Sequence, residues 1–201
     1  MEREQMRIRR LAERGELKQF QDGFRRAIQR RSRGAPGDVS LGYLQRCRVV
    51  RGVYDPQRVM IGGYAIGTTQ PLRLLEFVPD AARAEIRAPR GASWDDCCEI
   101  TCLWRTRAIS AAQMTLRVWP TLVFDAITAA KPYILRGSDD PRLDAYYNRM
   151  FPPTETLYRG PSVHGLDEHL SAYARKDGLR RVAYFVAIGI PRRFFGARWS
   201  R

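Results

Sequence analysis

One acidic residue stands inside an otherwise apolar stretch of the chain, Glu99 in the segment Cys97–Arg105 (CCEITCLWR). Burying a carboxylate costs several kcal/mol, of order 3–5, unless the group is paired or its pKa rises. A raised pKa would suit a general base that takes a proton from an amine. The alternative is a salt bridge to an arginine such as Arg46, Arg48 or Arg105. The sequence leaves both interpretations open.

The cysteines and histidines do not have the spacing of a metal site. Three of the four cysteines fall in the same apolar stretch as Glu99, and neither they nor His164 and His169 form two matched pairs of ligands. Tetrahedral zinc sites require such pairs. We therefore expect reduced core cysteines and no metal cofactor.

The chain is strongly basic, with a formal net charge of +14 over 201 residues. Such a charge attracts polyanions and acidic protein surfaces. Residues 1–33 are charged, but Leu17, Phe20, Phe24 and Ile28 recur at helical spacing, which predicts a basic amphipathic helix or arm packed on the main domain. The tail 191–201 mixes arginines with aromatic residues, a composition that either binds nucleic acid or docks on the core.

The central part of the chain, residues 38–190, is expected to form one domain. Residues 1–33 are charged throughout, and no apolar run of the chain approaches the length of a membrane span. We therefore expect a cytoplasmic protein without a membrane-spanning segment. Residues 32–38 are rich in turn formers and predict a linker.

Hydrophobic periodicity places the elements that must hold Glu99. The segment 97–105 is expected to be a central strand covered on both faces, because its apolar run is nearly continuous. Ser110 is expected to cap the helix that follows, with Pro120 as a kink and Lys131-Pro132 as its end. The remaining predicted elements are a hairpin at 42–53 and 59–67, strands at 132–136, 156–158 and 182–190, and helices starting at Asp139 or Asp140 and spanning 166–175.

These elements predict an α/β (α+β) fold with a mixed, mostly antiparallel central sheet flanked by helices. The order resembles the GNAT acyltransferase superfamily, and the stretch from Tyr54 to Glu99 is most similar to the autoinducer (acyl-homoserine-lactone) synthases and the N-acyl amino acid synthases. The segments that carry this resemblance are Tyr54-Asp55, Gly62-Gly63, Thr68-Thr69-Gln70-Pro71-Leu72, Phe77 and Glu99. Tyr64, Gly67 and Thr101-Cys102 depart from the autoinducer synthase pattern, which argues against lactone synthesis.

The resemblance also implies a set of site residues. Glu99 would be the general base, and Tyr147, with Tyr146 in reserve, would protonate the departing thiolate. Backbone amides of the central strand and of the loop after it would hold the thioester donor, through Leu103, Arg105, Arg107, Ala108 and Ser110. A plain strand-to-helix turn explains that loop equally well, because Ala108 stands where a glycine would let phosphate approach.

Two functions follow. The first is an N-acyltransferase that moves an acyl group from acyl-CoA or acyl-carrier protein to an amine, with the basic surface facing an acidic carrier protein. The second is a non-catalytic protein on the same fold that binds nucleic acid or an acidic protein partner.

Overall fold

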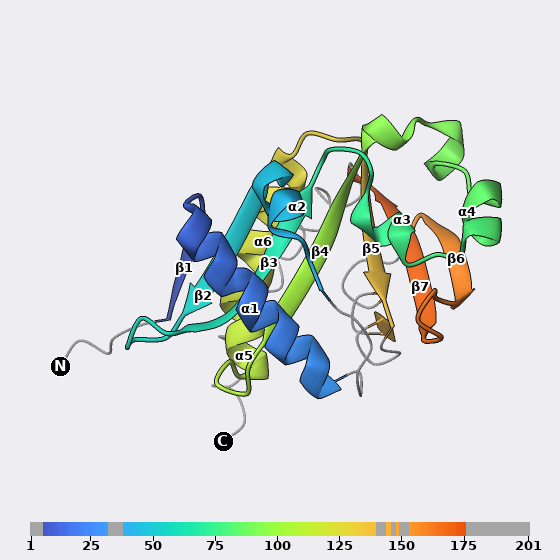
Figure 1. Ribbon diagram of the computed structural model, residues 1–201. Helices are drawn as coiled ribbons and strands as arrows, with labels where there is room; N and C mark the ends of the chain where they lie inside the picture. The colour runs from blue at the N-terminus through green and yellow to red at the C-terminus, as the bar shows by residue number, and fades with distance from the viewer. Residues whose placement is uncertain (1–5, 32–37, 140–143, 146–147, 149–152, 176–201) are drawn as a thin grey trace, which may run out of the picture.

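The computed structural model describes residues 6–31, 38–139, 144–145, 148 and 153–175 (Figure 1). Its centre is a seven-stranded sheet with the order β1-β2-β3-β4-β5-β7-β6. The strands are β1 (Arg7–Arg10), β2 (Val49–Tyr54), β3 (Met60–Gly67), β4 (Cys97–Arg105), β5 (Tyr133–Ser138), β6 (Glu155–Pro161) and β7 (Asp167–Ala174).

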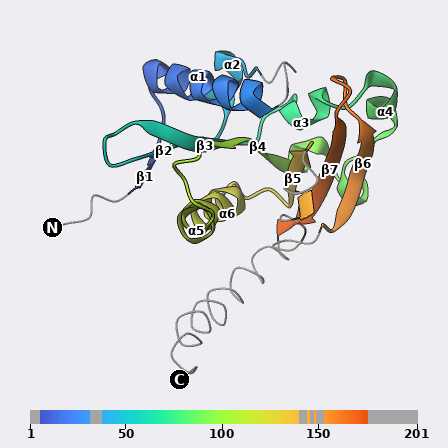
Figure 2. The same ribbon diagram turned by 90° about the horizontal axis from the view of Figure 1, so that it is seen from below.

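The sheet is mixed, because β4 and β5 run parallel whereas every other neighbouring pair is antiparallel. β4 occupies the middle position, as its apolar sequence predicts. Helices cover both faces, since Figure 2 shows α1 and α2 on one side of the sheet and α5 and α6 on the other. The predicted fold class is therefore confirmed.

Most of the helices are short. They are α1 (Arg14–Arg31), α2 (Leu41–Arg46), α3 (Arg73–Glu76), α4 (Asp80–Glu85), α5 (Ala111–Gln113) and α6 (Trp119–Thr128), with a π-helical turn η3 (Met114–Val118) between the last two and 3-10 turns η1 (Pro89–Gly91) and η2 (Trp94–Asp96) before β4. No helix of the described residues has the length and apolar character to cross a membrane.

Helix α1 packs on the sheet through the stripe that its sequence predicts. Leu17, Phe20 and Phe24 are buried, and the ring of Phe20 meets the Trp104 ring of β4 edge to face. The helix can approach this closely because Gly23 has no Cβ; an added Cβ would lie 2.5 Å from the Trp104 ring. Strand β1, which precedes the helix and pairs with β2, was not predicted.

The helical segment after β4 begins where the sequence indicates. Ser110 caps it in a reciprocal capping box with Gln113, which satisfies amides at the helix start. Pro120 is the second residue of α6, which directly follows the π-helical turn η3, and because it has no amide N–H it interrupts the regular hydrogen-bond ladder there. The predicted break at this proline is thus a change of helix type within one continuous segment.

Two local predictions were wrong. The segment 166–175 was expected to be a helix, but it contains strand β7, whose Leu170 and Ala172 face one side of the sheet and whose Tyr173 faces the other. β7 lies between β5 and β6, and both neighbours supply hydrogen bonds that a helix would not use. The predicted hairpin begins late, because Ser40 caps the helix α2 at 41–46 and the first strand starts at Val49.

Several predicted features lie outside the described residues: most of the linker 32–38, most of the helix after Asp139, the strand 182–190 and the tail 191–201. The four cysteines are free thiols, and three of them are buried in the core, as expected.

Candidate active site

The parallel strands β4 and β5 separate near the middle of the sheet. They pair from Cys97 and Tyr133 as far as Ile100 and Arg136, after which β4 continues to Arg105 and β5 to Ser138. Figure 1 shows the two strands diverging toward their carboxyl ends. The crevice beyond the carboxyl ends of neighbouring parallel strands is the usual ligand site of open α/β sheets.

A β-bulge lies on β4 directly beyond this point. Gly63 of β3 pairs with Trp104 and Ala65 pairs with Thr101, so one residue of β3 opposes two of β4. Cys102, in the bulge, has a φ of 52°. A bulge re-aims backbone and side-chain groups and is frequent beside active sites. The ladder with β3 is therefore interrupted at the bulge, just beyond Ile100, where the pairing with β5 ends.

The loop predicted to hold the donor phosphates is a tight turn. Arg105 Nη1 donates to Ile109 O at 2.5 Å, and the Ala108 amide donates to Thr106 Oγ1 at 3.3 Å. Arg107, Ala108 and Ser110 are exposed, while Leu103 of β4 is half-buried. The predicted residues are thus gathered at the carboxyl end of β4, and their part in donor binding stays a prediction.

Glu99 is 0% exposed and accepts three hydrogen bonds. Its Oε1 accepts from Tyr43 Oη at 2.7 Å and from the Arg73 amide at 2.9 Å, and its Oε2 accepts from the Leu74 amide at 2.8 Å. Burial raises the pKa of the Glu99 carboxyl, although the hydrogen bonds from Tyr43 and the two amides oppose it. Gly67 faces this group, where a Cβ would lie 2.7 Å from both Glu99 Oε1 and Tyr43 Oη.

The suggested salt bridge to Glu99 is absent among the described residues. Arg48 instead donates to Thr128 O, Arg105 donates to Ile109 O, and Arg46 forms no ion pair with Glu99. These arginines are wrong as partners because Glu99 points toward α3 and Tyr43, so its charge is met by the amides at the start of a helix.

Arg73 is a buried cation that sequence reasoning missed. It is 6% exposed, and its guanidinium lies over the Phe77 ring at 4.6 Å and the Phe24 ring at 5.6 Å. Its hydrogen-bond acceptors are Thr101 Oγ1 at 3.3 Å and Asp38 O at 3.2 Å. Among the described residues it forms no ion pair with a carboxylate. The available signal was a lone arginine in the apolar run 72–78.

Glu168 of β7 is a second buried charge on the same face of the sheet. It is 7% exposed, and a Cβ at Gly137 of β5 would lie 2.6 Å from its Oε1 and 3.0 Å from Leu74 of α3. Burial, with the charge of Asp139, raises the pKa of Glu168 to about 7, although Arg73 opposes the shift. A carboxyl with this pKa can take up and release a proton at neutral pH.

A polar network occupies the opposite face of β5. Arg136 is 2% exposed and donates from Nη1 to Asp144 Oδ1 at 2.7 Å and from Nη2 to Asn148 Oδ1 at 2.5 Å, while its Nε donates to the Tyr173 hydroxyl. The second oxygen of Asp144 lies 3.2 Å from His169 Nδ1. Tyr146 and Tyr147, the predicted proton donors, lie outside the described residues.

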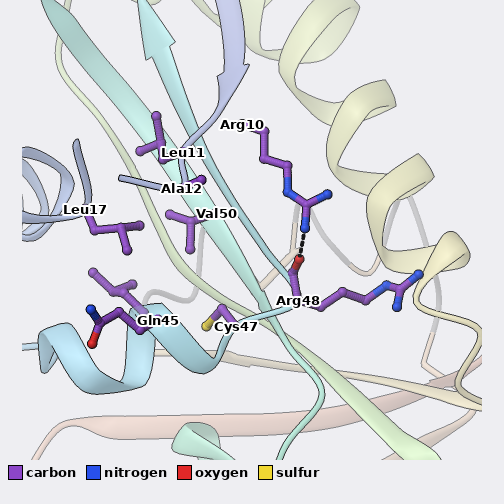
Figure 3. A pocket seen from close by; sticks show the side chains of 9 residues that line it. Arg10, Leu11, Ala12, Leu17, Gln45, Cys47, Arg48 and Val50 are labelled. Atoms are coloured by element: carbon purple, nitrogen blue, oxygen red, sulfur yellow. Dashed lines mark hydrogen bonds between the residues drawn. The ribbon is translucent and has the colours of Figure 1, made fainter. Parts of the chain in front are cut away.

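A cavity of about 210 Å³ lies at the other end of the sheet, between α1, α2 and β2 (Figure 3). Leu17, Leu44, Cys47 and Val50 line it, and Arg10 closes one side by donating to Arg48 O at 2.7 Å. Burial raises the pKa of the Cys47 thiol to about 12, so this thiol is not a nucleophile at neutral pH. No residue of β4 or β5 lines this cavity. It is separate from the candidate active site.

Among the described residues, no group of three histidine, cysteine or acidic side chains has the arrangement of a metal site.

Comparisons with known proteins agree with this geometry. No protein-family model and no curated protein matches the sequence. Among solved structures, FeeM, an N-acyl amino acid synthase from uncultured soil microbes, superimposes with a TM-score of 0.67 at 12% identity, over 90% of this chain and 98% of FeeM.

Acetyltransferases superimpose over a similar share of the chain. YncA from Salmonella typhimurium, solved with its cofactor acetyl-CoA, gives a TM-score of 0.58 at 12% identity, over 85% of this chain and 94% of YncA. An N-acetyltransferase from Staphylococcus aureus Mu50 gives 0.55 at 12% identity, over 85% and 99% of the two chains. The chain therefore has the fold of the GNAT acyltransferase superfamily.

Proposed function

We propose that the protein is an N-acyltransferase that moves an acyl group from a thioester donor to the amine of a small molecule that also carries a carboxylate, such as an amino acid. The observation that carries the proposal is the divergence of β4 and β5 beside the bulge at Cys102. The fold shared with YncA, which binds acetyl-CoA, and with FeeM, an N-acyl amino acid synthase, supports both the donor and the acceptor class.

The donor is proposed to lie between the diverging strands. The β4 amides beyond Ile100 lack β5 as a partner, and the bulge turns the backbone there. Amides aimed at a carbonyl oxygen stabilise the negative charge that develops on it during acyl transfer. The loop 105–110 would receive the polar part of acyl-CoA or of the phosphopantetheine arm of acyl-carrier protein. The net charge of +14 suits an acidic carrier protein.

The acceptor is proposed to lie on the α1–α3 face, between Arg73 and Glu168. Both groups are buried, and neither forms an ion pair among the described residues. A guanidinium binds a carboxylate in two places, and a carboxylate of suitable pKa takes the ammonium proton. A zwitterion would meet both groups at once, whereas a simple amine would offer Arg73 no carboxylate to bind.

Glu168 rather than Glu99 is our choice for the general base. Glu99 already accepts three hydrogen bonds and has no exposed surface, so an ammonium group cannot reach it without displacing them. Its contacts favour a positioning role, because they fix the start of α3 and therefore the origin of the Arg73 side chain.

A donor and acceptor survey tests the proposal. The purified protein is incubated with acetyl-CoA, long-chain acyl-CoA and acyl-carrier protein, each with a panel of amino acids and their decarboxylated amines, and products are identified by mass spectrometry. We expect N-acyl amino acids and at least tenfold slower transfer to the decarboxylated amines. The proposal fails if none of the donors yields an N-acylated product; binding of DNA or RNA at low salt would then favour the non-catalytic alternative.

Arg73→Lys tests the acceptor site. Lysine keeps the charge but not the two-pronged geometry, so the KM for the amino acid should rise about tenfold or more while transfer to the decarboxylated amine changes little. Arg83→Lys, on the exposed helix α4, is the matched control and should change neither. Equal effects on both acceptors would contradict carboxylate binding by Arg73.

A further inference from the structure

The network on the α6 face of β5 holds one histidine in a defined orientation. His169 Nδ1 lies 3.2 Å from Asp144 Oδ2, and Asn148 Nδ2 donates to the same oxygen at 3.0 Å. Arg136 fixes the other oxygen of Asp144, and Arg136 in turn bonds to Tyr173. The His169 side chain is 21% exposed, so its ring is held from the protein side and its other nitrogen can meet a substrate.

The position of His169 follows from the strand register. The last β4–β5 pair is Ile100 and Arg136, and His169 pairs with Ser138, the final residue of β5. Two residues of strand span about 7 Å, so His169 lies just beyond the point of divergence. Tyr173, which shares the network, packs with the α6 core, so this side of β7 faces the helices that follow β4.

We propose that His169, oriented by Asp144, is the catalytic acid that protonates the departing thiolate. This inference rests on the proposed function. Glu168 and His169 are neighbours at the start of β7, so Glu168 lies on one face of the sheet and His169 on the other. The acceptor proton and the leaving-group proton would thus be handled at adjacent residues on opposite faces.

The step balances as follows. Glu168 takes one proton from the acceptor ammonium, and the free amine attacks the thioester carbonyl. The C–N bond forms, the tetrahedral intermediate collapses and the C–S bond breaks. The thiolate takes the Nε2 proton of the His169 imidazolium, and the amide nitrogen gives up its second proton to solvent. His169 then regains a proton from solvent, and Glu168 releases the one it took.

Asp144 is suited to hold the imidazolium. Burial works to raise the pKa of its carboxyl, but the hydrogen bonds and charges of Arg136 and His169 outweigh burial, so the pKa lies below the ordinary value. An ionised carboxylate beside Nδ1 holds the ring by that nitrogen and leaves Nε2 for the leaving group. Asp144 is therefore a positioning residue in this proposal.

The experiment varies the leaving group. A thioester of an alkyl thiol, such as acyl-CoA, needs a proton on sulfur, whereas an aryl thioester with the same acyl group releases a stable thiolate. His169→Asn retains an amide N–H in place of Nδ1 but lacks the Nε2 acid. We expect its kcat with acyl-CoA to fall about 100-fold or more, in the range for general acid catalysis, and its rate with the aryl thioester to fall less than tenfold.

Comparison variants separate the alternatives. Asp144→Asn should also slow transfer from acyl-CoA more than transfer from the aryl thioester, with a smaller loss of rate than His169→Asn. Tyr147→Phe should show no such dependence on the leaving group. The inference is overturned if His169→Asn is as fast as the active wild type, or if it slows transfer from both thioesters equally. It is also overturned if Tyr147→Phe slows transfer from acyl-CoA more than His169→Asn does and leaves the aryl thioester unaffected. A wild type inactive with every donor refutes the proposed function itself. Thermal unfolding of each variant identifies any that has lost the fold, and His169→Gln then replaces His169→Asn.

Discussion

Replacing Glu168 by glutamine should change stability and activity in opposite directions as the pH rises. Burial raises the pKa of this carboxyl from its ordinary 4.5 to about 7 in the folded protein. Because the folded-state pKa is the higher one, the neutral carboxyl stabilises the fold fully below pH 4.5, and this contribution is lost as the pH rises through 7. At 1.36 kcal/mol per pH unit, the loss amounts to about 3 kcal/mol.

The assay compares the free energy of unfolding of the wild type and Glu168→Gln in urea at pH 4.5 and pH 8. Glutamine cannot ionise, so the variant should gain about 3 kcal/mol relative to the wild type between these pH values. Glu76→Gln, an exposed carboxylate on α3, is the control and should show no such gain. A constant difference between wild type and Glu168→Gln across this range would refute the reasoning.

The same residue sets the expected pH dependence of catalysis. A base works only when it is deprotonated, so kcat/KM of the wild type should rise with pH through about 7. In Glu168→Gln, kcat/KM should be about 100-fold lower or more and should no longer rise over this range. The charges that set this pKa are Asp139 and Arg73, so Arg73→Gln should move the limb to higher pH. A rate profile that is flat across pH 6–8 in the wild type would exclude Glu168 as the base.

Two further variants test the packing that holds the site. Gly23→Ala should destabilise the protein by about 1–2 kcal/mol, because the new Cβ would lie 2.5 Å from Trp104. Gly15→Ala on the same helix faces open space and should not destabilise it. Equal effects of the two variants in urea unfolding would contradict the close approach. Asp125→Asn should cost about 2 kcal/mol, because it removes the charge and one of the two oxygens that accept 2.8 Å bonds from Arg51. Asp22→Asn, in an exposed pair, should cost less than about 0.5 kcal/mol; calorimetry of the two variants checks the difference.

The sequence alone determined the parts of the fold that rest on local patterns. The apolar run at 97–105 predicted the central strand to the residue, and Ser110 predicted the helix start, because burial and capping depend on a few neighbouring side chains. The stripe of α1 was equally readable. The segment 166–175 was misread because its short alternation is decided by the strands on either side, β5 and β6, which are distant in sequence.

The sequence also singled out Glu99 as a carboxylate in an apolar strand, and Glu99 is buried. Which group meets its charge was not readable, because Tyr43 and the amides of α3 approach it from 25 to 56 residues away along the chain. A local pattern can show that a charge needs a partner. It cannot show which distant segment supplies one.

The tertiary structure alone decided the rest of the site. Glu168 and the pair Asp144–His169 carry no local signal that distinguishes them from solvated residues, and the apolar run around Arg73 does not show what the arginine contacts. These residues become a site through the position of α3 over β5 and of β7 beside it. The physical reason is that the register of a mixed sheet brings together residues that are far apart in sequence, and burial then changes their ionisation. The central strand and the helices around it could be predicted from the chain, but the chemistry at the end of β5 depends on the packing of three segments.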